Sequence, residues 1–257
     1  MSLPVLVVVP TYDEADNIGP LLAALLASVP DAHVLVVDDN SPDGTADLVA
    51  ARADHGDRVF LLRRPGKAGL GAAYRAGFAW ALNRSYDAVV QMDADHSHPP
   101  DRVPALVEAL AAADVAIGSR YVRGGTVRNW SPTRRAVSWL GNVYVRLVLA
   151  LPVRDATAGF KAFRADALRE IGVLTSHSNG YCFQIENTWQ ATRHGLRVVE
   201  VPITFTDRAR GTSKMSGRIV LEAVVRVLGW RYDEVVPRHA SRWTWGVWPS
   251  NARRRAS

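Results

Sequence analysis

The stretch that decides the fold is residues 33–44, HVLVVDDNSPDG, in which a short apolar run is followed by acidic and turn-forming residues. Residues 34–37 are all valine or leucine, as expected for a strand buried on both faces of a parallel sheet. The next residues would lie beyond the carboxyl end of this strand, where open α/β sheets bind ligands. Residues 40–44 suit a turn or a helix cap equally well. Two adjacent acids favour a ligand contact for Asp39.

Strand-like and helix-like segments alternate on both sides of this stretch. Further apolar runs predict strands at residues 3–9, 58–62, 88–92 and 114–117, and helical spacing predicts helices at 18–29, 45–53, 71–82 and 104–112. This alternation predicts an α/β fold with a mostly parallel sheet and helices on both faces. Later segments predict C-terminal amphipathic helices around one more strand, at residues 134–151, 183–194, 197–205 and 219–228.

The composition predicts a protein without a secretion signal. The 257 residues include one cysteine, Cys182, which cannot form an internal disulfide. The N-terminus lacks the basic, apolar and small-residue order of a signal peptide. The most apolar stretch, residues 137–153, contains an asparagine, an arginine and a proline and is shorter than the ~20 apolar residues that a bilayer requires. We therefore expect a reducing, cytoplasmic setting, with no signal peptide and no transmembrane helix.

The positive charge is concentrated at the C-terminal end. The net charge is +6, and from Arg208 onward eleven Lys and Arg face three acids, a local excess of +8. The segment 238–257 combines three tryptophans with an arginine run, which is typical of membrane interfaces. Two alternatives are a solvated tail and a nucleic-acid-binding module. Acidic clusters at the strand ends argue against nucleic acid, because carboxylates repel phosphates unless a metal intervenes.

A second acidic cluster follows the strand predicted at 88–92. Residues 93–100 read DADHSHPP, and Asp93 and Asp95 point to the same side if the backbone is extended. Two carboxylates with some waters leave coordination positions for diphosphate oxygens, which is how Mg²⁺ or Mn²⁺ is usually held beside nucleotides. The segment therefore predicts a hard-metal site.

Two alternatives apply to this cluster. Asp93 and Asp95 could cap the helix that the proline pair at 99–100 opens, because acids suit the positive end of a helix. His96 and His98 could bind zinc, but no thiolate and no second distant cluster supports that interpretation.

Two common nucleotide-binding motifs are absent. The first strand is followed by PTYDE at 10–14 rather than by a glycine-rich turn, which disfavours a nicotinamide enzyme. The Gly-Lys pair at 66–67 is not a phosphate loop, because Leu61 and Ala68 replace the required glycine and hydroxyl residue. The cationic segment 208–214, RARGTSK, is instead interpreted as a phosphate clamp that closes over a ligand.

Taken in order, these motifs resemble family 2 glycosyltransferases of the GT-A fold, and within them the polyprenol monophosphomannose synthases, also called dolichol-phosphate mannosyltransferases. The resemblance covers residues 3–228 and is carried by PTYDE (10–14), VDDNSPDGT (37–45), DAD (93–95), HPP (98–100), GSRY (118–121) and RARGTSK (208–214). One departure is DATAGFK at 155–161, where relatives usually show Ser before Gly-Phe. The resemblance implies a GT-A (nucleotide-diphospho-sugar transferase) domain over residues 1–230, followed by the basic, Trp-rich tail 231–257.

The resemblance also implies which residues bind the donor, GDP-mannose. Its guanosine part would contact Pro10, Tyr12, Glu14, Val37 and Asp39. The expected donor set also includes Lys67, Asp93, Ala94, Asp95, Arg208 and Lys214. Among these, Arg208 and Lys214 match the cations that hold the diphosphate. Mg²⁺ or Mn²⁺ would be bound by Asp95, with Asp93 and Ser97 beside it.

The same resemblance implies an acceptor, polyprenyl phosphate, whose phosphate would be held by Arg120, Arg134 and Ser138. An inverting attack of the acceptor oxygen on the sugar would give a β-linked mannosyl phosphate lipid. A phosphate monoester has its second pKa near ~6, so no general base is expected. The residues expected to act in catalysis are Asp95, Arg120, Arg134, Arg208 and Lys214.

The lipid acceptor implies peripheral binding at the cytoplasmic side of a membrane. We expect the tail and the apolar faces near 147–151 and 219–228 to provide it, or else a separate membrane-anchoring protein. No nucleic-acid partner is expected. The alternatives are a family 2 transferase that uses UDP-glucose or a related donor, and a catalytically silent subunit that binds nucleotide sugars.

Overall fold

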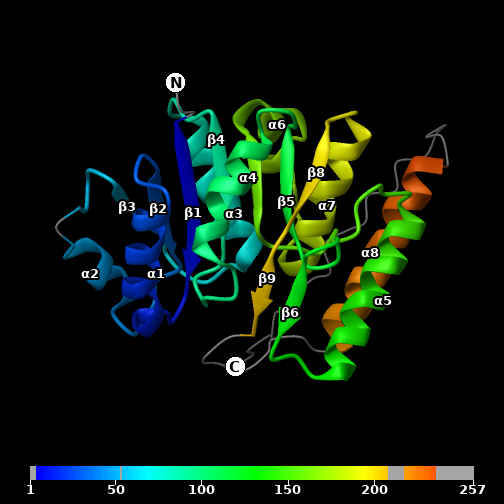
Figure 1. Cartoon of the computed structure of the whole chain (residues 1–257), viewed down its shortest axis with the longest axis horizontal. Helices are drawn as coiled ribbons and strands as arrows, with labels where there is room; N and C mark the ends of the chain where they lie inside the picture. The colour runs from blue at the N-terminus through cyan, green and yellow to red at the C-terminus, as the bar shows by residue number, and fades with distance from the viewer. Residues whose placement is uncertain (1–3, 53, 208–216, 236–257) are drawn as a thin grey trace, which may run out of the picture.

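A computed structural model describes residues 4–52, 54–207 and 217–235 (Figure 1). Its main sheet contains β1 (Val5–Thr11), β2 (His33–Asp38), β3 (Val59–Arg63), β4 (Ala88–Gln91), β5 (Val115–Ser119), β7 (Lys161–Arg164) and β8 (Val198–Pro202). In space these strands follow the order β3-β2-β1-β4-β7-β5-β8. Every pairing in this sheet is parallel except those of β7, which runs antiparallel between β4 and β5. The prediction of a mostly parallel sheet is confirmed.

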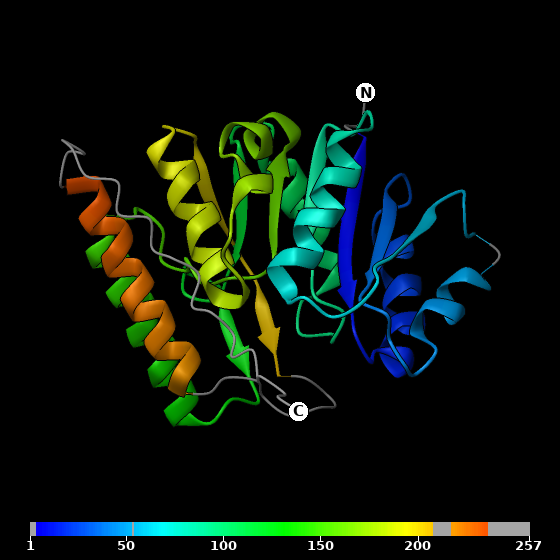
Figure 2. The ribbon, with the colours of Figure 1, turned by 180° about the vertical axis from the view of Figure 1, so that it is seen from behind.

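Helices cover both faces of the sheet, as predicted. They are α1 (Ala15–Ser28), α2 (Thr45–Ala50), α3 (Leu70–Leu82), α4 (Val103–Ala109), α5 (Pro132–Val148), α6 (Ala165–Glu170), α7 (Gly180–Arg193) and α8 (Gly217–Val235), with short 3₁₀ helices η1 (Pro100–Arg102) and η2 (Val173–Thr175). Figure 2 shows α3 and α7 in front of the sheet when the molecule is seen from behind. The core on that side includes Tyr74, Phe78 and Phe183, and the core on the other side includes Leu21 and Leu106.

Three elements were not anticipated from the sequence. The short strands β7 and β6 (Thr126–Arg128) and the helix α6 lie in segments too short to show a clear periodicity. The single strand predicted at 197–205 is two strands, because the chain leaves the main sheet at Ile203. Its second half, β9 (Thr204–Thr206), pairs in parallel with β6 in a separate two-stranded sheet.

The antiparallel direction of β7 has a consequence for the reacting edge of the molecule. A parallel strand begins at the far edge of the sheet and ends at the ligand-binding edge. Because β7 runs the opposite way, the loop that leads into it, residues 155–160, lies at the edge where β1, β4 and β5 end. This edge therefore receives an additional loop from late in the sequence.

Helices α5 and α8 lie side by side at one end of the molecule in both views (Figures 1 and 2). Tyr144 of α5 donates a hydrogen bond from its hydroxyl to the carbonyl oxygen of Val224 in α8, at 2.9 Å. Exposed apolar side chains occur on both helices: Val137, Trp139, Leu140 and Leu147 on α5, and Leu221, Val225 and Leu228 on α8. Within the described ranges, no helix has the length and apolar character needed to cross a bilayer.

Candidate active site

A cavity of about 280 Å³ opens at the carboxyl edge of β1, β2 and β4. Its lining includes most of the residues predicted to bind the donor, namely Pro10, Tyr12, Glu14, Asp39, Lys67, Asp93, Ala94 and Asp95. The structure thus brings together side chains from four separate segments of the chain. Val37 differs from this set, since its side chain is fully buried in the core toward α3. A donor contact for Val37 stays a prediction.

The two adjacent acids at the end of β2, Asp38 and Asp39, have different surroundings. Asp38 accepts hydrogen bonds from the Thr11 hydroxyl at 2.9 Å and from the backbone and hydroxyl of Ser41 at 2.9 and 2.6 Å. It therefore organises the turn, as does Asp43, which accepts from the backbone N–H of Thr45. Asp39 instead lines the cavity. The turn interpretation therefore holds for Asp38 and Asp43, and a ligand contact for Asp39 stays a prediction.

Cations hold two of the residues expected to bind the base. Arg64 forms an ion pair through Nη1 with Oδ1 of Asp39, and both side chains are largely buried. The Nζ of Lys67 lies 3.6 Å from the centroid of the Tyr12 ring, in cation–π contact. Arg64 was not anticipated from the sequence, because its partner lies one strand away rather than along the chain. The ion pair of Arg64 with one carboxylate oxygen of Asp39 fixes the orientation of the other oxygen.

Asp93 is oriented from two sides. The buried hydroxyl of Tyr74 donates to Asp93 Oδ1 at 2.8 Å, and the Asp93 backbone N–H donates to Nδ1 of His98 at 3.1 Å. Burial, followed by the charge of Asp93, raises the pKa of Tyr74 well above its ordinary value, so the phenol stays a donor. A side chain at Gly159 would approach Asp93 Oδ2 to 3.4 Å, so glycine there keeps room beside the carboxylate.

Asp95 and Ser97 lie together in the turn that follows. The Ser97 backbone N–H donates to Asp95 Oδ1 at 3.1 Å. The Ser97 hydroxyl oxygen is buried, and it has no hydrogen-bond partner among the described residues. A buried hydroxyl without a partner is costly and needs an explanation, such as an ion or a water. This observation fits the predicted second contact to a metal.

Neither histidine of this segment is arranged as a zinc ligand. His98 is fully buried and stacks on Phe160 at 5.1 Å between ring centroids. Burial lowers the pKa of His98 despite the attraction of Asp93, so the ring is neutral, and its Nδ1 accepts a hydrogen bond. His96 directs Nε2 toward the carbonyl oxygen of Asn17, at 3.1 Å. In the part of the chain that the structure describes, no three His, Cys, Asp or Glu gather in a metal-binding group.

The residues predicted to hold the acceptor phosphate lie beyond β5 and on α5. Arg120, directly after β5, is only 8% exposed and pairs with the fully buried Asp155. Burial opposes the charge of Arg120, but the attraction of Asp155 and its hydrogen bonds outweigh burial and raise the pKa of the guanidinium. Arg134 pairs with Asp207 at 2.6 Å and lies 4.4 Å from the ring centroid of Trp130.

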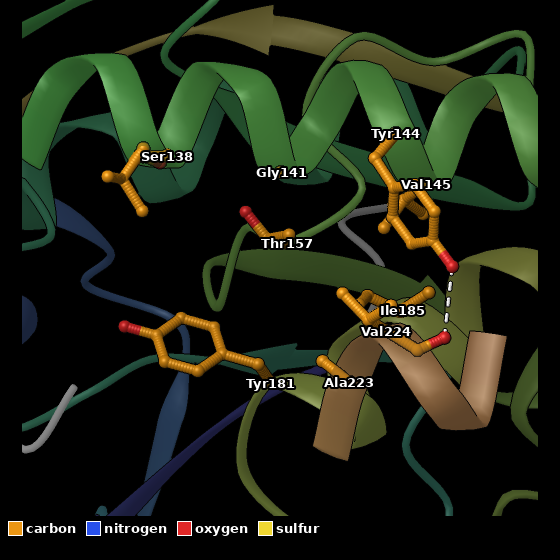
Figure 3. A pocket seen from close by; sticks show the side chains of 10 residues that line it. Ser138, Gly141, Tyr144, Val145, Thr157, Tyr181, Ile185, Ala223 and Val224 are labelled. Carbon is orange, nitrogen blue, oxygen red and sulfur yellow. Dashed lines mark hydrogen bonds between the residues drawn. The ribbon is translucent and has the colours of Figure 1, made fainter. Parts of the chain in front are cut away.

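A mostly apolar cavity of about 90 Å³ lies next to these residues, between α5, α7 and α8 (Figure 3). Ser138, Thr157 and Tyr181 bring hydroxyl groups to one end of it, and Tyr144, Val145, Ile185 and Val224 line the other end (Figure 3). Ser138 accepts a hydrogen bond from the hydroxyl of Tyr121 at 2.8 Å. This cavity was not anticipated, because three helices that are distant in sequence form it.

The predicted cations Arg208 and Lys214 lie outside the described residues, as does the tail 238–257. The residues immediately before them are described. The backbone N–H of Thr206 donates to the carbonyl oxygen of Ser97 at 3.3 Å, and that of Asp207 donates to the carbonyl oxygen of Arg128 at 3.1 Å. The chain thus passes directly beside the predicted metal segment just before residue 208.

This fold and this cavity define a class of protein. The family model described as "Glycosyl transferase family 2" matches residues 6–172, and this chain belongs to that family. The chain is 50% identical over 226 residues to the undecaprenyl-phosphate mannosyltransferase of Micrococcus luteus, covering 88% of this chain and 93% of that protein. It is also 50% identical over 228 residues to the polyprenol monophosphomannose synthase of Mycolicibacterium smegmatis, covering 88% and 86%.

Solved structures share the fold at lower identity. The mannosyl-3-phosphoglycerate synthase of Rubrobacter xylanophilus aligns with a TM-score of 0.66 and 19% identity, covering 94% of this chain and 78% of that one. The glucosyl-3-phosphoglycerate synthase of Mycobacterium tuberculosis, solved with Mn²⁺, uridine diphosphate and glucosyl-3-phosphoglycerate, aligns with a TM-score of 0.64 and 20% identity, covering 89% and 80%. The predicted GT-A fold and family are confirmed.

Proposed function

We propose that this protein transfers mannose from GDP-mannose to a polyprenyl phosphate, with inversion, to give a β-linked polyprenyl phosphate mannose. The observation that carries the proposal is the 50% identity, over 88% of the chain, to two proteins named for mannose transfer to such lipids. The donor cavity agrees with it, because most of the residues expected to bind a nucleotide diphosphate sugar line one space. Membership of a transferase family supports the reaction type.

The donor nucleotide would lie along the ends of β1 and β2. Tyr12 offers a ring to stack on, and Asp39 offers a carboxylate oxygen to the N–H groups of guanine. The ion pair with Arg64 holds that carboxylate in place. The sugar diphosphate would then extend toward Asp93 and Asp95, which line the same cavity.

The residues around Asp95 fit a bound Mg²⁺ or Mn²⁺. Carboxylate and hydroxyl oxygens are ligands that hard cations prefer. Asp95, Asp93 and Ser97 would supply them, and the buried Ser97 hydroxyl lacks a partner within the described ranges. Such an ion supplies neutralisation of the departing diphosphate when it is bound. Donor oxygens and waters would complete its shell, since the described residues contain no larger cluster.

The acceptor phosphate would lie on the other side of Asp93, near Arg120, Arg134 and Ser138. As a dianion at neutral pH, with a second pKa near ~6, it attacks without losing a proton to the protein. The protein's contribution is then to hold two repelling phosphate groups within reach of each other. The cavity between α5, α7 and α8 starts at Ser138 and is mostly apolar, so it suits the first isoprenoid carbons of the lipid.

The membrane would be met by α5, α8 and the C-terminal tail. Trp139, Leu140 and Leu147 on α5 are 53%, 56% and 75% exposed, and Leu221 on α8 is 64% exposed. Exposed apolar side chains gathered on two adjacent helices indicate an interaction surface. Burying them at a membrane interface is energetically favourable. We therefore propose peripheral binding, with the domain over residues 1–230 and the tail beyond it contributing basic residues. A separate membrane-anchoring protein is the competing explanation.

The test is incubation of the purified protein with radiolabelled GDP-mannose, polyprenyl phosphate and Mg²⁺ or Mn²⁺, followed by organic extraction. We expect label in the lipid phase that depends on both the acceptor and the metal. Parallel reactions with labelled UDP-glucose test the donor. Transfer from UDP-glucose alone would reject the donor assignment, and no lipid-soluble label with either sugar would reject the proposed function.

A further inference from the structure

The guanidinium of Arg120 is held in one fixed orientation by Asp155. Its Nε donates to Asp155 Oδ2 at 2.8 Å, and its Nη2 donates to Asp155 Oδ1 at 2.5 Å. The backbone N–H of Arg120 also donates to Asp155 Oδ2, at 2.9 Å. One carboxylate therefore binds the side chain and the main chain of the same arginine. Such forked pairs fix direction as well as charge.

This pairing leaves one nitrogen of Arg120 for a ligand. The Nη2 group donates also to the Thr157 hydroxyl at 2.9 Å, so Asp155 and Thr157 together occupy Nε and Nη2. Among the described residues, none accepts a hydrogen bond from Nη1. The Tyr121, Trp130 and Phe205 rings lie 5.3 to 5.5 Å from the guanidinium carbon. Nη1 is thus the nitrogen of Arg120 that can donate a hydrogen bond to a ligand.

Asp155 is itself firmly anchored. Its backbone N–H donates to Glu200 Oε1 at 2.9 Å, and the N–H of Arg154 donates to Glu200 Oε2 at 2.8 Å. Glu200 lies in the middle of β8, next to β5 in the sheet. The loop that carries Asp155 therefore rests on the same strands that carry Arg120.

The same loop also ties Arg120 to α5. The Thr157 hydroxyl accepts from Nδ2 of the buried Asn142 at 3.0 Å, and the Thr157 backbone N–H donates to Asn142 Oδ1 at 3.2 Å. Asn142 Nδ2 donates also to the carbonyl oxygen of Ser138, at 3.0 Å. A short chain of hydrogen bonds thus runs from Arg120 through Thr157 and Asn142 to Ser138. Ser138 lies one helical turn before Asn142 in α5. Both residues are expected at the acceptor phosphate.

We propose that Asp155 is a positioning residue for the acceptor: it orients Arg120 so that Nη1 meets the lipid phosphate, and with Thr157 it sets the distance from Arg120 to Ser138. The inference rests on the proposed function, because it takes the phosphate to bind at Arg120. It goes further because it distinguishes the effect of the charge of Arg120 from the effect of the orientation of its guanidinium. Asp155 cancels the charge of Arg120, so it could favour an anionic acceptor only through orientation.

The variant Asp155→Asn separates these two effects. The substitution adds one positive charge to the site, so electrostatics alone would tighten binding of the phosphate dianion. Loss of orientation would weaken it instead. We expect the KM for farnesyl phosphate, a short polyprenyl phosphate, to rise roughly tenfold to a hundredfold, as for one charge-assisted hydrogen bond. The KM for GDP-mannose should stay within about twofold, because neither Asp155 nor Arg120 lines the donor cavity.

A matched control is Asp54→Asn. Arg52 holds Asp54 in the same forked geometry, with hydrogen bonds of 2.7 and 2.8 Å, but the pair lies near the end of α2, away from the reacting edge. This variant should leave both KM values unchanged. An equal rise in acceptor KM in the two variants would overturn the inference, as would an unchanged or lower acceptor KM in Asp155→Asn.

The buried site makes a second, milder pair of variants necessary. Thr157→Val removes the hydroxyl that contacts Arg120, whereas Thr157→Ser keeps it. If Asp155→Asn does not fold, a severalfold rise in acceptor KM for Thr157→Val, with recovery in Thr157→Ser, supports the inference, and equal values in the two contradict it. Calorimetric binding of farnesyl phosphate repeats each comparison without turnover. A wild type that binds this lipid but transfers no mannose would reject the proposed function alone.

Discussion

The backbone N–H of Thr206 donates a hydrogen bond to the carbonyl oxygen of Ser97, at 3.3 Å. This contact joins two segments separated by more than a hundred residues. Ser97 follows the acids predicted to hold a metal, and Thr206 precedes the cations predicted at 208–214. The proposed mechanism requires both groups to act on one diphosphate.

Lys214 provides a first test of that requirement. We expect Lys214→Ala to lower kcat about 10²-fold, because a cation that stabilises the departing diphosphate acts mainly in the transition state. The KM for GDP-mannose should change much less. Steady-state kinetics at saturating acceptor measure both values. A variant with normal kcat would remove Lys214 from the site.

Asp95 provides a second test. Asp95→Asn should reduce mannose transfer by at least about 10²-fold, since an amide is a poor ligand for a divalent cation. The fold should persist, because the amide oxygen can still accept from the Ser97 backbone N–H. Transfer assays with a Mn²⁺ titration and a melting curve measure the two effects. Asp101→Asn, an exposed acid on the same segment, is the control and should behave as wild type. Full activity in Asp95→Asn would refute the metal assignment.

The buried amine of Lys161 leads us to expect an unusual dependence of folding stability on pH. Burial lowers the pKa of Lys161 to about 7, although the charge of Asp155 acts in the other direction. The ordinary lysine pKa is about 10.4, so between the two values the unfolded chain binds a proton that the folded chain does not. Folding is therefore weakened as pH falls from about 10.4 to about 7, and the penalty is constant below that.

The corresponding measurement uses Lys161→Met, which has no proton to bind. The free energy of unfolding of this variant, relative to wild type, should be most favourable near pH 7 and should fall steadily toward pH 10. The loss of hydrogen bonds to the Gln184 carbonyl and the Thr188 hydroxyl shifts the whole curve but not its slope. Urea unfolding at a series of pH values measures this difference. A constant difference across that range would show that Lys161 is protonated in the fold.

Membrane binding can be divided between the helices and the tail. Deleting residues 238–257 should reduce co-sedimentation with anionic liposomes, because each basic residue near the surface contributes about 1 kcal/mol. Replacing Leu140 and Leu147 with serine should reduce binding to neutral and anionic liposomes alike. Leu174→Ser, which alters an exposed leucine on η2, is the control. If neither change affects the bound fraction, a separate anchoring protein becomes the explanation.

The sequence predicted the donor side of the site better than the acceptor side. Tyr12, Asp39 and Asp95 follow β1, β2 and β4, which run parallel to one another, so one rule about strand ends brings them together. Asp155 could not be placed in this way. It precedes an antiparallel strand whose direction depends on distant pairings, such as Val90 with Ala162. The motif at 155–161 and Arg120 were both visible in the sequence, but the pairing of Asp155 with Arg120 was not.

The late insertion of β7 also constrains how the chain can fold. Until residue 164 has been synthesised, β4 has a partner on only one side, and its other edge exposes unpaired N–H and C=O groups. The first four strands can assemble locally, but the sheet cannot be completed from the N-terminal half alone. Fragments that stop before β7 should therefore aggregate through β4, and slow translation just upstream of it should lower the yield of native protein.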